Sequence, residues 1–511
     1  MSFGERRSRL DARALAGAAA LALILAAGTA AATPIDDPFV AGMSFSGPTS
    51  GDLGAIYWNP AALGLMRGFQ LMVAGTARWS RVSVSRAPIN QMTGMTPGTT
   101  PTGSATATDF RQPFTWPPGP GAYVALGYGS DRFTLAFATY MPYLEQIHFP
   151  TSPTGNEPTR YQMLSMDLRN LALVPALAIR FGNDFRVGLS SGFLFSTGSL
   201  SFAEDTALTA PGGPTSVTCG TGPCNAENPA AAARYNIDSG QGLGSASFSL
   251  TLGGGIYYRH KNLELGLSYQ SHPLASQVNN VEVTADQTTV TLPPRQGGGL
   301  ATCGGGQSAR CVFGDISYRL PDVVIGGVTW HFGPGLQLDV MARWIWTHLH
   351  DKIDIRLIGP TLEADGLPER IVLYRGFHDV VDTRARVAYW YRERLRVGAE
   401  LRVENGAVDE NALNAGAVDG LQIEPVVLAE LRLGRRFWLG AGYGLTIMPG
   451  TTVTDSIFHP TDATTCANNY VNGDLANPAC QSRANGTARP TANGTYTSFV
   501  QDFGLTFTFR L

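Results

Sequence analysis

Residues 394–404 read RLRVGAELRVE, and apolar and charged side chains alternate along most of this stretch. One face of an extended chain would carry Val397, Ala399, Leu401 and Val403, and the other would carry Arg396, Glu400 and Arg402. A period of two residues is the pattern of a β-strand whose two faces meet different surroundings. The stretch therefore predicts a strand with one apolar face and one charged face.

The same alternation recurs from Gly68 to the C-terminus and marks fourteen strands. Their predicted ranges are 68–87, 121–129, 132–148, 161–181, 185–203, 243–259, 262–286, 312–332, 336–358, 368–391, 394–404, 420–433, 436–455 and 495–511. A charge facing lipid near the midplane costs roughly 2–4 kcal/mol, so the charged faces must point into a lumen. We predict an all-β fold in which residues 68–511 form a 14-stranded antiparallel transmembrane β-barrel. A soluble β-sandwich or propeller is the alternative, but no propeller-like repeat is present.

The connections between the predicted strands fall into two classes. Those after the even-numbered strands are tight turns, such as Ser130-Asp131 and His260-Lys261. Those after the odd-numbered strands are longer and rich in Gly, Pro, Ser and Thr, at 88–120, 149–160, 204–242, 287–311, 359–367, 405–419 and 456–494. Bacterial outer-membrane barrels have short periplasmic turns and long extracellular loops. An even strand number then places both ends of the barrel in the periplasm.

Composition and the N-terminus agree with export to the outer membrane of a Gram-negative bacterium. Charged residues make up 15% of the 511 residues and 60 are Gly, as expected for lipid-out, polar-in strands. Four arginines between residues 6 and 13 precede an apolar run at 14–27 and the small residues 30–32, which predicts a signal peptide over residues 1–32. The run is shorter than the roughly 20 residues of a membrane-spanning helix.

Six cysteines fall in three close pairs within the predicted extracellular loops. The pairs are Cys219 with Cys224, Cys303 with Cys311, and Cys466 with Cys480. An even number of cysteines with local partners in an exported chain predicts three small disulfide loops. Metal binding is the alternative, but no pair has CxxC spacing and no His cluster accompanies them.

Residues 33–67 precede the first strand and do not alternate cleanly; they contain Asn59-Pro60-Ala61. Pro60 fixes its own φ and biases Asn59 away from helix, so the chain turns sharply there. The Asn59 amide could then bond to barrel backbone or lumen side chains, although an ordinary Asx-Pro turn is an open alternative. Fourteen strands leave a lumen that must be filled or it leaks. We therefore predict that residues 33–67 form a hatch that plugs the barrel.

This motif resembles that of the FadL/TodX family of outer-membrane transporters for long-chain fatty acids and other hydrophobic compounds, whose hatch carries Asn-Pro-Ala. Ala62 stands where family members usually have Gly. Residues 140–143, 174–178 and 320–322 also resemble family segments, in the family's order. The resemblance implies passive uptake of a hydrophobic substrate captured by extracellular loops, with loops 204–242 and 287–311 shaping the outer groove. The alternatives are a general porin for small polar solutes, or a non-transport protein such as an adhesin or barrel enzyme.

Pro142 lies inside the third predicted strand, where proline removes a hydrogen bond from the ladder. A closed barrel has no edge strand, so Pro142 predicts a bulge or a gap in the wall. The resemblance implies that such a kink serves as a lateral exit into the bilayer. An apolar molecule leaving there need not cross water, which preserves about 0.8 kcal/mol per buried methylene. A bulge without function near the extracellular rim is the alternative.

Charged side chains gather on the lumen faces of four adjacent predicted strands between residues 336 and 433. The candidates for contact with the hatch or with a substrate headgroup are Arg343, Arg384, Arg386, Arg402 and Glu430. A guanidinium suits a carboxylate headgroup, but pairing between wall residues is the simpler interpretation.

Other chemistry is not indicated by the sequence. It contains no GxSxG, HExxH, Walker or dinucleotide motif, so we expect no enzymatic activity and no cofactor. His348 and His350 share a face of the predicted strand, but two histidines alone are a weak metal signal, and we expect no metal. The net charge of −3 gives no sign of a nucleic-acid partner. The expected partners are the substrate, outer-membrane lipid and the barrel-assembly machinery that reads the aromatic C-terminal strand; we expect a monomer.

Overall fold

In the computed structural model, the described residues are 39–86, 103–113, 119, 121–151, 157–205, 218–219, 222–223, 232–238, 247–271, 277–287, 310–333, 335–358, 370–454, 456 and 492–511. The signal peptide lies outside them. So does at least one cysteine of each predicted disulfide, namely Cys224, Cys303, Cys466 and Cys480. The three disulfides and the signal peptide therefore stay predictions.

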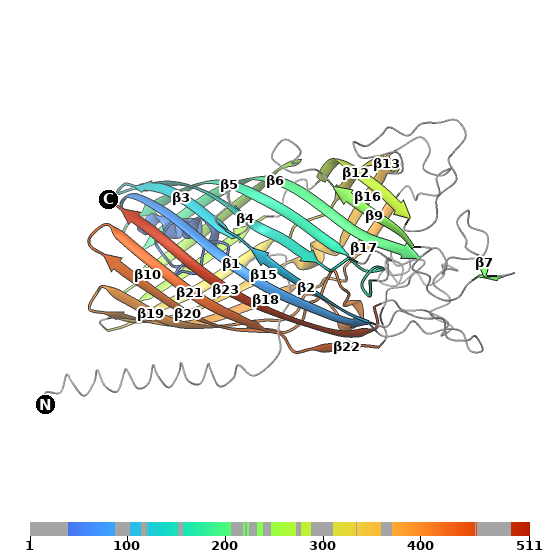
Figure 1. Cartoon of the computed structure of the whole chain (residues 1–511). Helices are drawn as coiled ribbons and strands as arrows, with labels where there is room; N and C mark the ends of the chain where they lie inside the picture. Colours follow the sequence, from blue (N-terminus) through green and yellow to red (C-terminus); the bar gives the residue numbers. More distant parts are fainter. Residues whose placement is uncertain are drawn as a thin grey trace, which may run out of the picture.

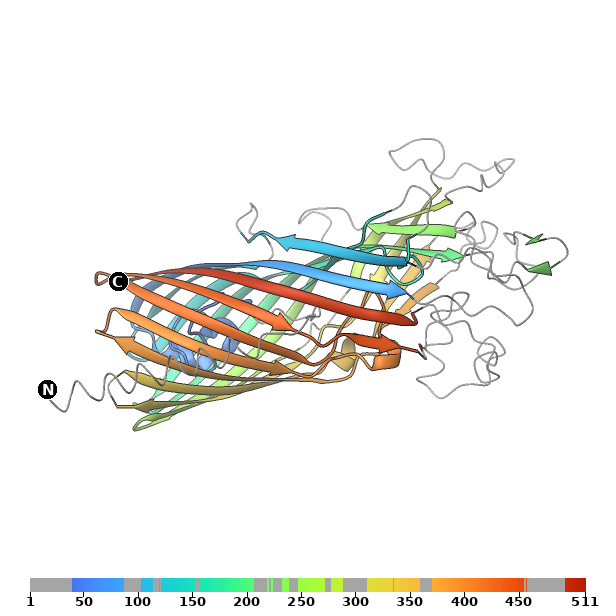
Figure 2. The same cartoon turned by 60° about the horizontal axis from the view of Figure 1, so that its bottom comes forward.

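Fourteen strands form a closed antiparallel ring (Figures 1 and 2). In ring order they are β1 (Gly68–Arg86), β3 (Ala122–Gly129), β4 (Phe133–His148), β5 (Ser165–Phe181), β6 (Phe185–Asp205), β10 (Ser247–His260), β11 (Leu263–Gln270), β14 (Val323–Phe332), β15 (Leu336–Ile345), β18 (Val380–Tyr391), β19 (Leu395–Glu404), β20 (Gln422–Leu433), β21 (Phe437–Ile447) and β23 (Gly494–Arg510). The ring closes where β1 pairs with β23, from Gln70 with Arg510 to Arg86 with Gly494. Each predicted strand overlaps one ring strand, so the fold class and the strand number are confirmed.

Tight turns join the strands at the end of the barrel that carries the C-terminus (Figure 1). Backbone with positive φ occurs at Gly182, Lys261, Gly333, Arg392 and Gly434, all within the predicted tight turns. Such φ values let two antiparallel strands reverse over two or three residues while keeping their twist. The predicted turns are therefore confirmed, and this end of the barrel is the periplasmic one.

Five further strands prolong the wall at the opposite end of the barrel (Figure 1). They are β9 (Ala232–Asp238), β12 (Gln277–Gln287), β13 (Arg310–Ser317), β16 (Lys352–Ile358) and β17 (Arg370–Tyr374), and we call them the outer extension. They pair in the order β6–β9–β12–β13–β16–β17. The prediction of unbroken strands over 262–286, 312–332, 336–358 and 368–391 was therefore wrong, because each is divided between the ring and the outer extension.

The remaining elements are short or lie beside the ring. They are β2 (Gly103–Arg111), which pairs with the outer half of β1, β7 (Thr218–Cys219), β8 (Gly222–Pro223), β22 (Thr451–Val453), the helix α2 (Ala55–Trp58), and the 3-10 helices η1 (Pro60–Leu65), η4 (Thr347–His350) and η6 (Glu410–Ala412). The helices of the described part of the chain are too short to cross a bilayer.

The two faces of the ring differ as the alternation predicts. Large apolar side chains are exposed on the outside, including Leu189 at 61% and Val427 at 53%. The intervening side chains of the same strands point inward and are buried, including Arg402 and Glu424. An apolar outer band with polar groups inside is the arrangement that a bilayer requires of a barrel.

We expect Val427→Arg, near the middle of β20, to destabilise the folded barrel in lipid by about 2–4 kcal/mol, because the new charge would face the acyl chains. Urea titration of the protein refolded into vesicles measures this. Glu393→Arg, at a periplasmic turn, is the matched control and should leave stability near that of the wild type. Equal stability of the two variants would contradict the assignment of the lipid face.

Candidate functional site

Residues 39–66 lie inside the periplasmic half of the ring, and we call them the hatch segment (Figure 2, blue). They contain α2 and η1, whose side chains are almost entirely buried. Asn59 stands between the two helices and is 0% exposed. Its Oδ1 accepts from the Ala61 N–H at 3.0 Å, and its Nδ2 donates to the Pro48 carbonyl at 2.8 Å and to the Ile256 carbonyl of β10 at 3.0 Å.

The Asn59-Pro60 step packs against a part of the wall that is made of glycines. A Cβ added to Gly188 of β6 would lie 2.2 Å from the Pro60 carbonyl carbon, and one added to Gly255 of β10 would lie 2.2 Å from Asn59 Oδ1. A Cβ on Gly266 of β11 would lie 2.1 Å from the Pro48 carbonyl oxygen. Only glycine allows the hatch backbone to approach the wall this closely. This contact was not predicted from the sequence, although all three glycines interrupt lumen-facing positions.

Arginines of the wall hold the carbonyl groups of the hatch segment. Arg386 donates to Phe45 O at 2.9 Å and to Ser46 O at 3.2 Å. Arg186 donates to Gly64 O at 3.2 Å, and Arg180 also donates to this carbonyl. Charge-assisted bonds to backbone are stronger than neutral ones, so the hatch segment is tied to both sides of the ring.

The predicted lumen charges form one network, which we call the lumenal charge cluster. It consists of Asp339, Arg343, Asp382, Arg384, Arg386, Glu400, Arg402, Glu404 and Glu424. Asp382, which is 0% exposed, lies at its centre and accepts from Arg343 at 2.6 Å, Arg384 at 2.9 Å and Arg402 at 2.9 Å. Asp382, Glu404 and Glu424 were not singled out from the sequence, although extending the two-residue period from Arg384 and Arg402 would have found them.

The cluster contacts the hatch through Tyr57 and Trp58. Arg343 donates to the Tyr57 hydroxyl at 3.1 Å, and the Trp58 ring lies 5.7 Å from Arg343 and 5.0 Å from Arg384. Glu430, the fifth predicted residue, lies on the same face of β20 but forms no ion pair within the described part of the chain.

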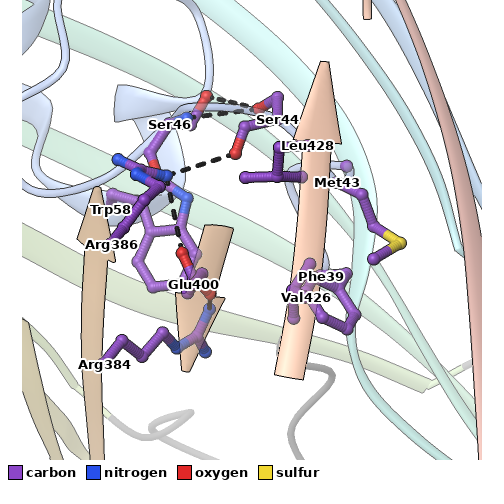
Figure 3. A pocket seen from close by; sticks show the side chains of 11 residues that line it. Phe39, Met43, Ser44, Ser46, Trp58, Arg384, Arg386, Glu400, Val426 and Leu428 are labelled. Atoms are coloured by element: carbon purple, nitrogen blue, oxygen red, sulfur yellow. Dashed lines mark hydrogen bonds and ion pairs between the residues drawn. The ribbon is translucent and has the colours of Figure 1, made fainter. Parts of the chain in front are cut away.

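A small cavity remains between the hatch segment and this part of the wall (Figure 3). Arg384, Arg386 and Glu400 lie on one side of it and Phe39, Val426 and Leu428 on the other. Its volume is about 10 Å³, roughly the space that one water molecule needs. Ligand sites for small molecules enclose roughly 300–1,000 Å³, so this cavity does not hold the substrate.

Pro142 lies at a bulge in β4. Tyr140 pairs with Ala172 of β5, whereas Tyr143 pairs with Asn170, so three residues of β4 advance against two of β5. Shifting a strand by one residue exchanges its two faces. Before the bulge the even-numbered residues of β4 point inward, and beyond it the odd-numbered residues Tyr143, Glu145 and Ile147 are buried while His148 is exposed.

Beyond the bulge, β4 has no strand partner on its other side within the described residues. Its ladder with β3 ends at the pair Tyr123 and Tyr140. Further out its neighbour is β2, and the contacts between them involve side chains. His148 N donates to Asp109 Oδ2 at 3.1 Å, and Arg111 donates to the Leu144 carbonyl at 3.4 Å. The wall is therefore interrupted beside Pro142.

The inverted face of β4 reaches across the lumen to the opposite wall. The Tyr143 hydroxyl donates to the Pro321 carbonyl at 3.1 Å, and Glu145 Oε2 accepts from Arg375 Nη1 at 2.5 Å. Pro321 and Arg375 lie in the breaks between β13 and β14 and between β17 and β18. Both breaks supply partners for the inverted face of β4, and these contacts could not be derived from the pattern of one strand.

His350 joins the same contact. Its Nδ1 donates to the Arg319 carbonyl at 2.6 Å, so its Nε2 can accept from Arg375 Nη1 at 2.9 Å. Burial and the neighbouring Arg375 lower the pKa of His350 well below its usual value, which keeps it neutral. His348 is half-exposed and pairs instead with Asp379. The two histidines thus point apart, and the described residues contain no group of three potential metal ligands.

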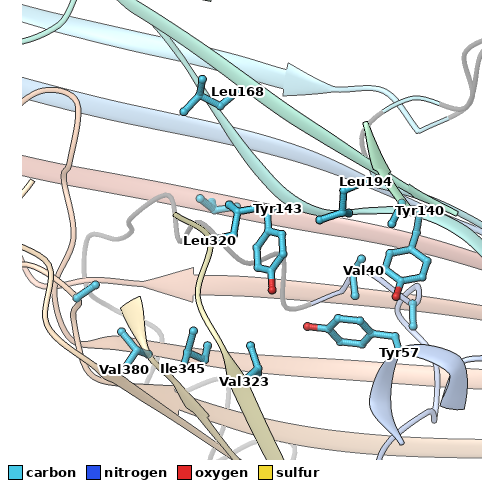
Figure 4. Packing of buried hydrophobic residues seen from close by; sticks show 14 of the residues in the cluster. Val40, Tyr57, Tyr140, Tyr143, Leu168, Leu194, Leu320, Val323, Ile345 and Val380 are labelled. Atoms are coloured by element: carbon cyan, nitrogen blue, oxygen red, sulfur yellow. The ribbon is translucent and has the colours of Figure 1, made fainter. Parts of the chain in front are cut away.

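Apolar and tyrosine side chains surround the bulge on the lumen side (Figure 4). Tyr57 of the hatch segment packs edge-on against Tyr140 at 5.9 Å, and Tyr140 stacks on Tyr123 at 5.4 Å. The opposite wall contributes Leu320, Val323, Ile345 and Val380. This apolar cluster lies directly inside the interrupted part of the wall.

Two segments fold inward at the extracellular end; they comprise parts of the predicted loops 149–160 and 405–419 and the first residues of the strands predicted after them, and were not anticipated as interior. Residues 157–164 and 405–421 are mostly buried. They meet where Gln162 Oε1 accepts from the Ala415 N–H at 2.6 Å, and Arg375 donates to the Gly416 carbonyl at 3.1 Å. The small apolar residues of 405–421 could have signalled this. The loops expected to form the groove, 204–242 and 287–311, lie largely outside the described residues.

Comparison with known proteins identifies the family. The model of the family described as outer membrane protein transport protein (OMPP1/FadL/TodX) matches residues 14–415. No curated protein matches the sequence. A Pseudomonas aeruginosa FadL homologue shares the fold with a TM-score of 0.67 and 14% identity, covering 94% of this chain and 99% of that one.

Two solved toluene transporters share the fold as well. Pseudomonas putida TodX aligns with a TM-score of 0.61 and 10% identity, covering 95% of this chain and 99% of that one. Ralstonia pickettii TbuX aligns with a TM-score of 0.55 and 11% identity, covering 93% and 99%. At these identities the likeness establishes the fold alone, whereas the family match spans most of the sequence. This protein belongs to the OMPP1/FadL/TodX family of outer membrane transport proteins.

Proposed function

We propose that this protein carries hydrophobic molecules, long-chain fatty acids or aromatic hydrocarbons, passively across the outer membrane. Extracellular segments capture the substrate, the apolar cluster around Tyr57 and Tyr140 receives it, and it leaves sideways beside Pro142. The observation that carries the proposal is the interrupted wall at the bulge, because it adjoins the apolar cluster. An apolar molecule on this route stays out of water until it reaches the acyl chains.

The hatch segment acts as the plug in this proposal. Its contacts with the glycines of β6, β10 and β11 and with Arg386 fill the periplasmic half of the lumen. A general porin needs an open aqueous path, which such a plug would block. Planar bilayers discriminate between the two functions, since steady porin-sized currents through the wild-type protein would favour the porin.

The remaining partners and properties belong to the same proposal. The barrel-assembly machinery inserts the chain, the mature protein works as a monomer, and it has no catalytic role. The transport step is tested by initial uptake of labelled toluene and labelled dodecanoate. Uptake of at least one of the two compounds should fall in cells that lack the protein and return with the intact gene, and unchanged uptake of both would refute the proposal.

We expect Pro142→Val to lower initial uptake by about threefold or more, because valine supplies the N–H that allows the ladder to close. Pro425→Val in β20, where proline adjoins no bulge of the β4 type, is the matched control. Both variants should keep the heat-modifiable mobility of a folded barrel on gels. Wild-type uptake by a folded Pro142→Val protein would remove Pro142 from the exit route.

We expect Gly255→Ala to raise ion conductance in planar bilayers, because its Cβ would collide with Asn59 and displace the hatch segment. Gly254→Ala is the control on the neighbouring residue, where a Cβ meets nothing closer than 3.5 Å. Identical conductance of the two variants would contradict the assignment of the hatch segment as the plug.

A further inference from the structure

The bulge at Pro142 brings one buried ion pair into the proposed exit. Glu145, three residues beyond the proline, is 2% exposed, and its partner Arg375 is 5% exposed. Without the bulge Glu145 would lie on the opposite face of β4. The pair stands at the same level of the barrel as Tyr143, which lies between Pro142 and Glu145 along the strand and also points inward. Any substrate that passes the bulge therefore passes this charge.

Arg375 donates its hydrogen bonds to groups of the protein. Its Nη1 donates to Glu145 Oε2 at 2.5 Å and to His350 Nε2 at 2.9 Å, and its Nη2 donates to the Gly416 carbonyl at 3.1 Å. Its guanidinium also lies 4.5 Å from the centre of the Phe377 ring. A substrate carboxylate could reach this cation only by displacing Glu145.

Only one oxygen of the Glu145 carboxylate, Oε2, is paired with Arg375. Its Oε1 accepts no hydrogen bond from the described residues and lies 3.8 Å from His350 Nε2, which carries no proton in the tautomer fixed by Arg319. The pair together with neutral His350 has no net positive charge, so it offers nothing to an anion.

The cations of the lumenal charge cluster, deeper in the barrel, are also held by carboxylates. In the lumenal charge cluster the guanidiniums of Arg343, Arg384, Arg386 and Arg402 each lie 2.6–3.0 Å from a carboxylate, so these cations are already paired. The apolar cluster between the two charged regions is neutral. A carboxylate entering it would lose its hydration, and the guanidinium of Arg375 beside it is already paired with Glu145, whereas an uncharged molecule has no such cost.

We propose that Glu145 is a specificity-determining residue, which neutralises Arg375 beside the bulge and so restricts transport to uncharged hydrophobic molecules. This inference rests on the proposed transport function and narrows its substrate class to neutral compounds, such as hydrocarbons and esters, against fatty-acid anions. Glu145 determines which substrates pass, because its ion pair with Arg375 keeps that guanidinium from binding a substrate.

The test uses two probes that differ only in charge, radiolabelled dodecanoate and its methyl ester, at neutral pH. Initial uptake is measured in cells that lack the protein and carry either the full-length gene or the empty vector. We expect the wild type to take up the ester at least about tenfold faster than the anion, because only the anion must be desolvated without a partner. Equal rates for the two probes would overturn the inference without any variant.

Glu145→Gln keeps the shape of the side chain and removes its charge, so Arg375 becomes able to bind a carboxylate. We expect uptake of the anion to rise by about threefold or more while uptake of the ester stays close to the wild type. Arg375→Gln removes the guanidinium and should keep the anion excluded, because neither form of Glu145 attracts a carboxylate. Glu410→Gln, an exposed carboxylate in the inward-folded segment 405–421, is the matched control.

The outcomes separate this inference from the transport function. A folded Glu145→Gln protein with the wild-type ratio of anion to ester would overturn the role of Glu145 while leaving transport intact. Failure of the wild type to take up either probe would overturn this inference, whereas the transport function is refuted only if uptake of toluene is independent of the protein as well. If Glu145→Gln does not fold, equal uptake of the anion and the ester by the wild type would still overturn the inference.

Discussion

The closure of the backbone ladder into a ring is the constraint on which the rest of this structure depends. In lipid every N–H and C=O of the wall must find a partner within the protein, and pairing β1 with β23 leaves no free edge in the ring. Fourteen strands closed in this way enclose more space than the side chains of the wall can fill. The interior must therefore be filled by other parts of the chain, and both the hatch segment and the inward-folded extracellular segments serve this need.

Two parts of the wall contact the hatch segment in opposite ways. On β6, β10 and β11 the wall has glycines at the contact, and Gly188 and Gly266 let the hatch backbone touch the strands directly. On β15, β18, β19 and β20 the wall carries long charged side chains, and Arg386 reaches the hatch carbonyls. Those arginines were candidates for binding a substrate headgroup. In the structure they pair with Asp382 and its neighbours, as a buried guanidinium requires a carboxylate close by.

The backbone ladder of the wall is interrupted at the bulge beside Pro142. Proline cannot complete the ladder, and the extra residue exchanges the faces of β4, so one local irregularity has two consequences. It interrupts the wall toward β2, and it turns Tyr143 and Glu145 inward to meet Pro321 and Arg375. The proposed exit and the proposed selection against anions thus arise from the same residue. The strand breaks at 318–322 and 375–379 supply the partners for the inverted face.

Alternation along single strands was enough to predict the number of strands, the lipid face, the tight turns and the kink at Pro142, because a period of two and the chemistry of proline are local properties. The segment Asn59-Pro60-Ala61 also marked the inward-lying N-terminal part. The sequence could not show that Glu145 faces the lumen, since the bulge inverts the pattern by which faces are assigned. Nor could it show that Arg375, 230 residues away, would be the partner of Glu145. Such contacts form across the barrel, between strands that are neither sequential nor paired, and only the closed tertiary structure brings them together.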